Sequence, residues 1–198
     1  MKTRILTATL ENIKEAAEVV KKGGLVVYPT ETVYGLGCDP FNVSAVKRLI
    51  KAKGARDKPL PILAHSVHEV KRVAELTEKG EKLARKFWPG PLTLILPGKD
   101  LPDIVKLGSA TVGVRIPKNS VALKLLEFSG GLLVGTSANK TGALPSSTAL
   151  EAYEQLKNEV DVVLDGGVVE LGLSSTVLDL TSKDPKIIRK GPLTIKET

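Results

Sequence analysis

The stretch Pro29-Thr30-Glu31-Thr32-Val33-Tyr34-Gly35-Leu36-Gly37 follows the apolar run Leu25 to Tyr28, which predicts a buried strand. It places two threonine hydroxyls, a carboxylate and a phenol where that strand ends. Open α/β sheets bind ligands at the carboxyl ends of their strands, so we expect a ligand site here. An ordinary loop is the alternative, because polar residues, proline and glycine are common in turns.

Helix and strand signals alternate along the rest of the chain. Apolar residues at helical spacing between Glu11 and Lys22 end at Gly23-Gly24 and predict a helix. Four more helices are predicted to start at a serine or threonine cap: Ser44 to about Lys53, Thr77 to Trp88, Ser120 to about Gly130, and Ser147 to about Asn158. Short apolar runs predict strands at residues 25–28, 59–64, 92–96, 111–116, 132–134, 160–164, 176–180 and 186–189. This alternation predicts one α/β domain over residues 1–198, built on a twisted, mixed open sheet flanked by helices.

Length and composition fit an ordinary globular protein. The 198 residues and 42% hydrophobic content are sufficient for a sizeable core. The single cysteine, Cys38, excludes a disulfide within the chain and a multi-cysteine zinc site. No apolar run approaches the roughly 20 residues that span a bilayer, and the N-terminus lacks a secretory h-region. We therefore expect a cytoplasmic protein without a membrane partner.

The formal charge of +7 is concentrated in one segment. Residues 47–58 contain six cations and a single acid, Asp57. Such a cluster suits phosphate, carried either by a nucleotide or by RNA. For Lys47, Arg48 and Lys51 the alternative is a solvated helix face whose cations complement the helix dipole.

Several common sites are excluded by the sequence. Gly130 to Gly135 has the spacing of a phosphate-binding loop, but Thr136 follows where that loop needs lysine. No Gly-x-Gly-x-x-Gly joins a strand to a helix, so the dinucleotide fingerprint is absent. His65 and His68 are the only histidines and lack a third metal ligand, and no Ser/His/Asp or Cys/His arrangement is evident. Chemistry in this chain must therefore use hydroxyls, cations and backbone dipoles.

Five motifs occur in one order over nearly the whole chain. They are residues 29–37, Trp88-Pro89-Gly90-Pro91-Leu92-Thr93, Val112-Gly113-Val114-Arg115-Ile116-Pro117, Ser137-Ala138-Asn139 and Ser175-Thr176-Val177. In this order they resemble the YrdC-type threonylcarbamoyl-adenylate synthases. The resemblance implies a YrdC-like fold with a basic cleft, at about the length of the stand-alone domain and without the additional C-terminal domain of the longer branch.

The resemblance implies condensation of L-threonine, bicarbonate and ATP into threonylcarbamoyl-AMP, with release of pyrophosphate. A downstream threonylcarbamoyl transferase complex would then use this product to modify tRNA. Arg115 offers a bidentate, permanently charged partner for the threonine carboxylate. A small mixed pocket around the threonine side chain needs hydroxyls and a wall. The residues that match the threonine side are Thr32, Tyr34, Arg115, Ser137, Ser175 and Thr176.

The ATP side needs cations along the triphosphate and donors where charge builds up during adenylyl transfer. The residues that match it are Lys53, Arg56, Lys58, Thr111, Asn139, Ser147 and Arg189. Ser147 has an alternative role as a helix cap. The arginine is displaced from the family's Lys-x-Arg spacing, so either Lys53 or Arg56 could take each phosphate contact. Mg²⁺ is expected with the triphosphate, held mainly by phosphates and water.

A non-catalytic module that binds double-stranded RNA or tRNA is the competing interpretation, because a basic cleft can grip phosphates without chemistry. Three Tyr, three Phe and one Trp leave few aromatic rings for base stacking, which favours the enzyme. Adenylate formation on another amino acid or carbamoyl donor is a third interpretation, which the size of the pocket would discriminate.

Overall fold

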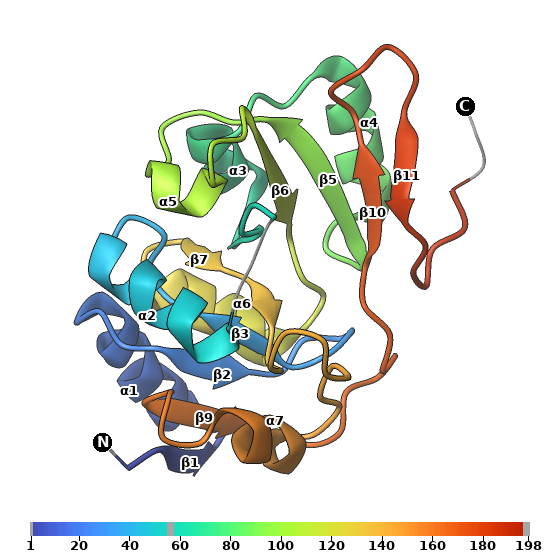
Figure 1. The fold of residues 1–198 in the computed structure, drawn as a ribbon. Coiled ribbons are helices and arrows are strands. Elements are labelled where there is room, and N and C mark those ends of the chain that lie inside the picture. Colours follow the sequence, from blue (N-terminus) through green and yellow to red (C-terminus); the bar gives the residue numbers. More distant parts are fainter. Residues whose placement is uncertain (1, 55–57, 196–198) are drawn as a thin grey trace.

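The computed structural model describes residues 2–54 and 58–195, so the predicted ATP ligand Arg56 lies outside the described residues. The strands form two sheets, where the sequence predicts one (Figure 1). The five-stranded sheet has the order β1 (Arg4–Thr7), β9 (Val162–Asp165), β2 (Val26–Tyr28), β3 (Gly35–Gly37) and β8 (Thr136–Ser137). The six-stranded sheet has the order β11 (Lys186–Arg189), β10 (Thr176–Asp179), β5 (Leu92–Pro97), β6 (Thr111–Arg115), β4 (Ile62–Ala64) and β7 (Leu132–Val134). Both sheets mix parallel and antiparallel pairs, which confirms the α/β class and the mixed pairing.

Helices cover the five-stranded sheet on both faces. On one face, α1 (Leu10–Lys21) and α6 (Ser120–Phe128) pack against each other, and their buried residues join those of β2 and β9 in one apolar cluster. The helix α7 (Ala149–Leu156) contacts β9 and β2 and belongs to the other cluster. The apolar stripe predicted for residues 11–22 is therefore confirmed as the face by which α1 enters the core.

The six-stranded sheet has one apolar face and one polar face. On β5, Leu92, Leu94 and Leu96 are fully buried in the larger apolar cluster. The helix α3 (Val67–Val73) contacts β4 and β6, and α4 (Glu78–Phe87) contributes Ala84 to the same cluster. The short helix α5 (Asp103–Lys106) contacts α2 (Val43–Lys53), which reaches the five-stranded half through the bond from Arg48 to Asp161. Alternation along a strand then turns Thr93 and Ile95 to the opposite face. Burying each leucine side chain contributes about 1.5–3 kcal/mol to the stability of the fold. The leucine face of β5 therefore packs into the core, and the face of Thr93 and Ile95 stays open for a ligand.

Three predicted helix caps are shifted in the structure. Thr77 caps α4 as predicted, since its side chain accepts from the Gly80 N–H. The caps predicted at Ser44, Ser120 and Ser147 are wrong: the caps of α2, α6 and α7 are Asn42, Asn119 and Thr148. In each helix the capping oxygen lies one or two residues away from the predicted serine and reaches the backbone N–H three residues further on.

The two sheets are joined where β7 of one continues into β8 of the other. Gly135 lies between them, and its N–H donates to the Pro61 carbonyl at 2.8 Å. A Cβ at this position would lie 2.3 Å from Leu63 Cγ, so only glycine fits the crossover. The chain thus brings β8 and β4 together at the junction of the sheets, which is where the candidate site lies. In the described part of the chain, no helix has both the length and the apolar content needed to cross a bilayer.

Candidate functional site

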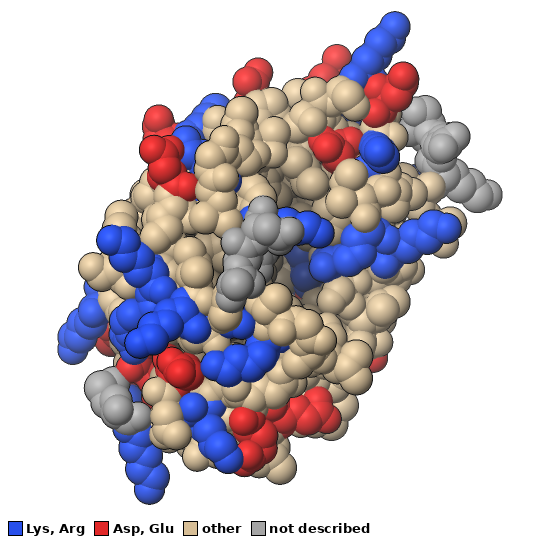
Figure 2. All heavy atoms as spheres, in the orientation of Figure 1, with Lys and Arg blue, Asp and Glu red and all other residues tan. Residues whose placement is uncertain are grey.

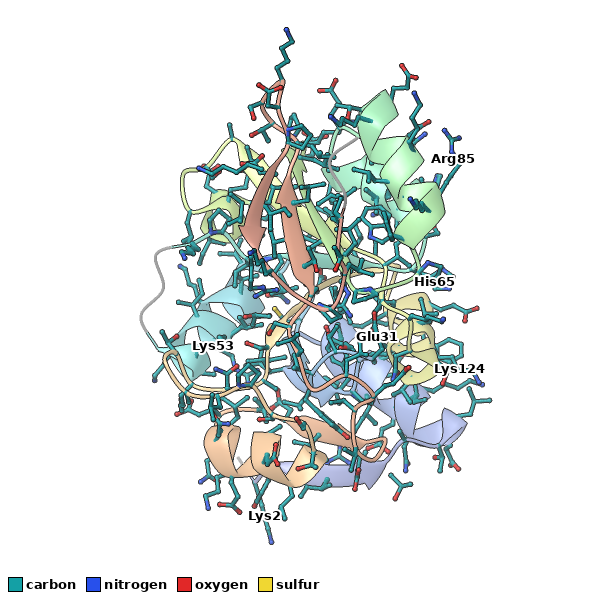
Figure 3. The ribbon with its side chains drawn as sticks, turned by 90° about the vertical axis from the view of Figure 1, so that its right-hand side faces the viewer. Lys2, Glu31, Lys53, His65, Arg85 and Lys124 are labelled. Carbon is teal, nitrogen blue, oxygen red and sulfur yellow. The ribbon has the colours of Figure 1, made fainter. Side chains whose placement is uncertain are left out.

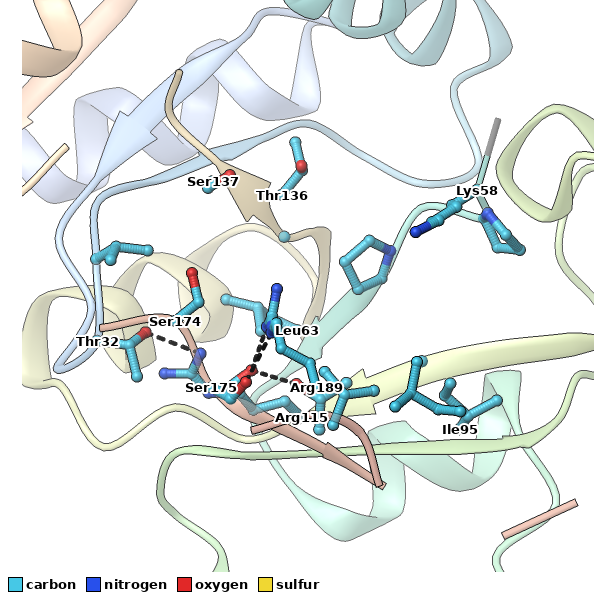
Figure 4. A pocket seen from close by; sticks show the side chains of 18 of the residues that line it. Thr32, Lys58, Leu63, Ile95, Arg115, Thr136, Ser137, Ser174, Ser175 and Arg189 are labelled. Atoms are coloured by element: carbon cyan, nitrogen blue, oxygen red, sulfur yellow. Dashed lines mark hydrogen bonds between the residues drawn. The ribbon is translucent and has the colours of Figure 1, made fainter. Parts of the chain in front are cut away.

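A cavity of about 520 Å³ lies where the two sheets meet (Figure 4). Its floor is the polar face of the six-stranded sheet, to which β5 and β6 contribute alternate residues. They are Thr93, Ile95, Thr111, Gly113 and Arg115. The opposite wall comes from the β2–β3 loop and from β8, and Figure 2 shows Lys and Arg side chains beside the hollow of this face. The structure therefore forms a cavity at the strand ends where the sequence predicts a ligand site.

Arg115 is held at the inner end of this cavity by three acceptors. Nε donates to the Gly90 carbonyl at 3.1 Å, Nη1 to Thr32 Oγ1 at 3.0 Å, and Nη2 to Glu31 Oε2 at 2.7 Å. Burial lowers the pKa of Arg115, and the Glu31 carboxylate acts in the opposite direction. A guanidinium carries five N–H donors, so two remain for a ligand. Arg115 thus presents a fixed fork to the cavity, as expected of a carboxylate-binding group.

The polarity of the Thr32 hydroxyl is determined by its neighbours. Thr30 Oγ1 donates to the Val33 carbonyl at 2.7 Å and lies 2.8 Å from Thr32 Oγ1. Because a hydroxyl has one proton, Thr32 must donate to Thr30 and accept from Arg115. Thr32 lines the cavity, as predicted for the threonine side, but it has no proton left to donate to a ligand.

A second guanidinium reaches the cavity from β11. Arg189 donates from Nε to the Ser175 carbonyl at 2.9 Å and from Nη2 to Ser175 Oγ at 3.0 Å, and Ser175 Oγ lies 2.8 Å from Thr93 Oγ1. Partial burial and the charge of Arg115 both lower the pKa of Arg189. No acid pairs with Arg189 among the described residues. Two cations that repel each other therefore face one cavity, which is an arrangement that binds anions.

The outer part of the cavity carries a further cation and more hydroxyls. Lys58 and Thr111, both predicted for the ATP side, line it. Ser137, from the predicted threonine side, lines the cavity and also a small adjoining space that Arg115 lines too. Thr111 Oγ1 lies 2.9 Å from Ser109 Oγ. Thr93, Ser109 and Ser174 also line the cavity and were not predicted. The alternation of Thr93 with buried leucines along β5 was the available signal for that residue.

Lys53 and Asn139, both predicted for the ATP side, lie behind the wall. Lys53 Nζ donates to the carbonyls of Ser137 and Asn139 at 2.6 and 2.7 Å, and the lysine is 4% exposed. The Asn139 amide donates to the carbonyls of Lys140 and Ala143, while its Oδ1 is buried without a partner among the described residues. Neither side chain is among the described lining residues. The structure thus gives both residues contacts that hold the turn after β8.

Three other predicted residues have mainly structural contacts. The Tyr34 hydroxyl donates to the Gly167 carbonyl at 2.7 Å, and burial raises its pKa. Thr176 Oγ1 donates to the Leu193 carbonyl at 3.2 Å. The Ser147 carbonyl accepts from Val169 N–H at 3.0 Å. Tyr34 lines only a small annex of about 30 Å³ beside the main cavity, and the other two line neither space.

The described residues contain no group of three His, Cys, Asp or Glu side chains that could hold a metal ion. The cavity itself is lined by hydroxyls, cations, apolar side chains and backbone, without a carboxylate among the described lining residues. A divalent cation entering with a nucleotide would thus find neutral oxygens here, and its charge would be balanced by the phosphates.

Comparison with known proteins gives close relatives for most of the chain. The chain is 41% identical over 188 residues to the threonylcarbamoyl-AMP synthase of Pyrococcus abyssi, with 93% of this chain and 55% of the relative covered. It is 37% identical over 188 residues to that of Bacillus subtilis, with 92% and 54% covered. The chain therefore spans about half the length of these two curated relatives.

A solved structure of one of these relatives has a similar fold. The structure of P. abyssi Sua5 complexed with L-threonine superposes with a TM-score of 0.93 at 38% identity, covering 98% of this chain and 58% of that one. The family model Sua5/YciO/YrdC, described as "Telomere recombination", matches residues 18–191. The chain belongs to the Sua5/YciO/YrdC family.

Proposed function

We propose that this chain is an L-threonylcarbamoyladenylate synthase, which converts L-threonine, bicarbonate and ATP into threonylcarbamoyl-AMP, pyrophosphate and water. One observation carries the proposal. Arg115 and Arg189 face one 520 Å³ cavity whose floor is rich in hydroxyls, and Lys58 lies on its outer wall. This arrangement suits a small amino acid beside a polyphosphate. The names of the relatives, and the L-threonine in the similar P. abyssi structure, support the same activity.

Arg115 is the proposed threonine ligand. Its two remaining N–H groups form charge-assisted hydrogen bonds with the carboxylate, and its permanent charge is suited to this role. The Thr32 oxygen, which can only accept, holds the guanidinium from behind. Ser137 and Ser175, at opposite walls, are the proposed hydroxyl neighbours of the amino acid.

The nucleotide half is proposed to extend from Arg189 toward Lys58 and Thr111. Arg189 lies close enough to Arg115 for their charges to interact, so an anion between them relieves repulsion. Lys58 would meet the distal phosphates, with Arg56 proposed beside it from sequence alone. ATP enters as its magnesium complex, because the lining residues that the structure describes include no carboxylate to hold a separate ion.

Catalysis in such a site is mostly placement. The described lining contains no His, Asp or Glu that could act as a general base. Holding the reactants in the correct orientation lowers the activation barrier by up to about 7–11 kcal/mol, which is enough for a large acceleration without a general base. The threonine amine forms an N–C bond to the carbon of bicarbonate, a C–O bond of bicarbonate breaks, and water leaves to give the carbamate. A carboxyl oxygen of that carbamate then bonds to the α-phosphorus, and pyrophosphate leaves.

The product is an activated carbamate, so a transferase must consume it. We propose a cytoplasmic chain that supplies a threonylcarbamoyl transferase complex acting on tRNA. The net charge of +7 favours one alternative, a module that only binds tRNA or double-stranded RNA. In that case RNA affinity would fall steeply with salt and no small-molecule product would form.

The test is product analysis by mass spectrometry of purified chain with ATP, bicarbonate and Mg²⁺, with L-threonine present or omitted. Threonine-dependent threonylcarbamoyl-AMP together with pyrophosphate is the expected result. Serine and valine replace threonine in parallel reactions to test for another amino acid substrate. ATP consumption without a threonine-dependent adenylate would refute the proposal.

A further inference from the structure

Glu31 lies behind the cavity and does not line it. The residue comes from the loop between β2 and β3 and is 3% exposed. Figure 3 labels Glu31 near the middle of the view, whereas Lys2 and Arg85 lie at its edges and point outward. A ligand in the cavity would meet Arg115 and not Glu31. Glu31 therefore acts on the direction of that ligand through the guanidinium that it contacts.

The contact between Glu31 and Arg115 connects the two halves of the fold. Glu31 lies in the loop that joins two strands of the five-stranded sheet, and Arg115 ends β6 of the six-stranded sheet. The 2.7 Å bond from Nη2 acts together with those to Thr32 and Gly90. Three acceptors around a planar group restrict its rotation, which determines where the two remaining N–H groups point.

The second oxygen of Glu31 is not satisfied. Oε1 is buried and has no hydrogen-bond partner among the described residues. A buried charged atom without a partner lowers stability, and apolar side chains of similar size often replace such pairs without loss. Stability alone therefore gives a poor account of this carboxylate, and a role in the site gives a better one.

Charge in the cavity supports that role. Arg115 and Arg189 interact unfavourably, since the charge of Arg115 lowers the pKa of Arg189. Glu31 is the acid that pairs with Arg115, at 2.7 Å. Its negative charge offsets one of the two cations, which favours an acid at this position, whereas the direction of Arg115 is fixed by the hydrogen bond.

We propose that Glu31 is a positioning residue for threonine binding, which fixes the guanidinium of Arg115 so that its two remaining N–H groups face the carboxylate. This inference rests on the proposed function. A purely structural ion pair would lower stability without a selective effect on threonine. A positioning role instead predicts that loss of the Glu31 side chain weakens threonine binding while ATP binding is retained. It also predicts that threonine binding recovers in a variant that keeps the hydrogen bond to Arg115 without the negative charge.

The experiment compares Glu31→Ala, Glu31→Gln and a matched control, Asp161→Asn. Asp161 is also a buried acid paired with an arginine, Arg48, at 3.0 Å, but it lies outside the cavity. Titration calorimetry gives the Kd of L-threonine and of ATP for each folded variant, and thermal melting gives its stability. Glutamine keeps an oxygen that can accept from Arg115, so it separates orientation from charge.

We expect Glu31→Ala to weaken threonine binding at least tenfold, with ATP binding changed less than threefold. Glu31→Gln should stay within about threefold of the unmodified chain for both ligands, and Asp161→Asn should lose stability only. If alanine does not fold, Glu31→Asp, which shortens the reach by one methylene, should show the same selective loss. The inference would be overturned if Glu31→Gln and Glu31→Ala lost threonine affinity equally, or if Glu31→Ala lost affinity for threonine and for ATP equally. Either result would leave the proposed function in place. Absence of threonine binding in the unmodified chain would overturn the proposed function with it.

Discussion

Replacing Arg115 by methionine should remove threonine binding and destabilise the fold, and the two effects can be separated. Arg115→Met leaves the buried Glu31 carboxylate without its partner, and removing one member of a buried pair costs about 3–5 kcal/mol. It also leaves the Gly90 carbonyl and the Thr32 hydroxyl without the guanidinium. The double variant Glu31→Leu, Arg115→Met keeps these last two losses but removes the orphaned charge.

The double variant should therefore be more stable than the single one by about 3 kcal/mol. For a chain of this size, each kcal/mol shifts Tm by about 2–4 °C, so its Tm should be about 6–12 °C higher. Threonine binding should not recover. Two charge-assisted hydrogen bonds contribute about 1.5–3 kcal/mol each, and their loss corresponds to a factor of about 10²–10⁴ in affinity.

The assay is threonine-dependent pyrophosphate release, measured over a range of threonine concentrations with ATP and bicarbonate saturating, alongside thermal melting. The stable double variant should need at least 100-fold more threonine than the unmodified chain. A double variant that is folded and has a threonine KM within tenfold of the unmodified chain would refute Arg115 as the carboxylate ligand.

Three further predictions concern Lys58 and Gly113 in the site and Cys38 in the core. Lys58→Ala should raise the ATP KM up to about fivefold with the threonine KM unchanged, because a single exposed cation contributes about 1 kcal/mol. The exposed Lys118→Ala is the control, and a shift confined to the threonine KM would count against the assignment. Gly113→Val should lower turnover at least tenfold, because its methyls enter the cavity. It should also lower Tm by about 2–12 °C, because its Cβ would lie 3.3 Å from Thr93 Cγ2 and overpacking costs about 1–3 kcal/mol. Gly98→Val, outside the cavity, should keep activity, and a fully active Gly113 variant would contradict the geometry. Burial, and then the charge of Asp39, raise the pKa of Cys38 to about 12, so only about one thiol in 10⁴ is ionised at pH 8. Iodoacetamide should therefore label the denatured chain and not the native chain, as detected by mass spectrometry. Rapid labelling of the native chain would show that the thiol is accessible.

The sequence predicted those elements of the fold that carry strong apolar periodicity, such as α1 and β5. It missed β3 and β8, whose residues are glycine, threonine and serine apart from Leu36. β3 pairs with β2 and with β8 through backbone hydrogen bonds, and β8 is distant from β3 in the sequence. Strands this short, without a run of β-branched or aromatic residues, have no local signal. Without them, the division of the strands into two sheets could not be predicted.

Arg115 and Lys53 show how far the sequence could predict the site. Arg115 follows an alternating strand, so its position at the strand end was predictable, and the structure places it in the cavity. Lys53 was predicted from its place in a basic run, yet its ammonium lies between carbonyls 84 and 86 residues away. A carbonyl is present at every residue, so no side-chain pattern shows that the carbonyls of a turn will bind a lysine.

If Lys53 holds this turn and does not touch phosphate, Lys53→Met should lower Tm by several degrees, because two buried carbonyls lose this donor. The ATP KM of the folded variant should then change less than that of Lys58→Ala. If Lys53→Met instead raises the ATP KM more than Lys58→Ala does and leaves Tm unchanged, Lys53 binds the nucleotide and does not hold the turn.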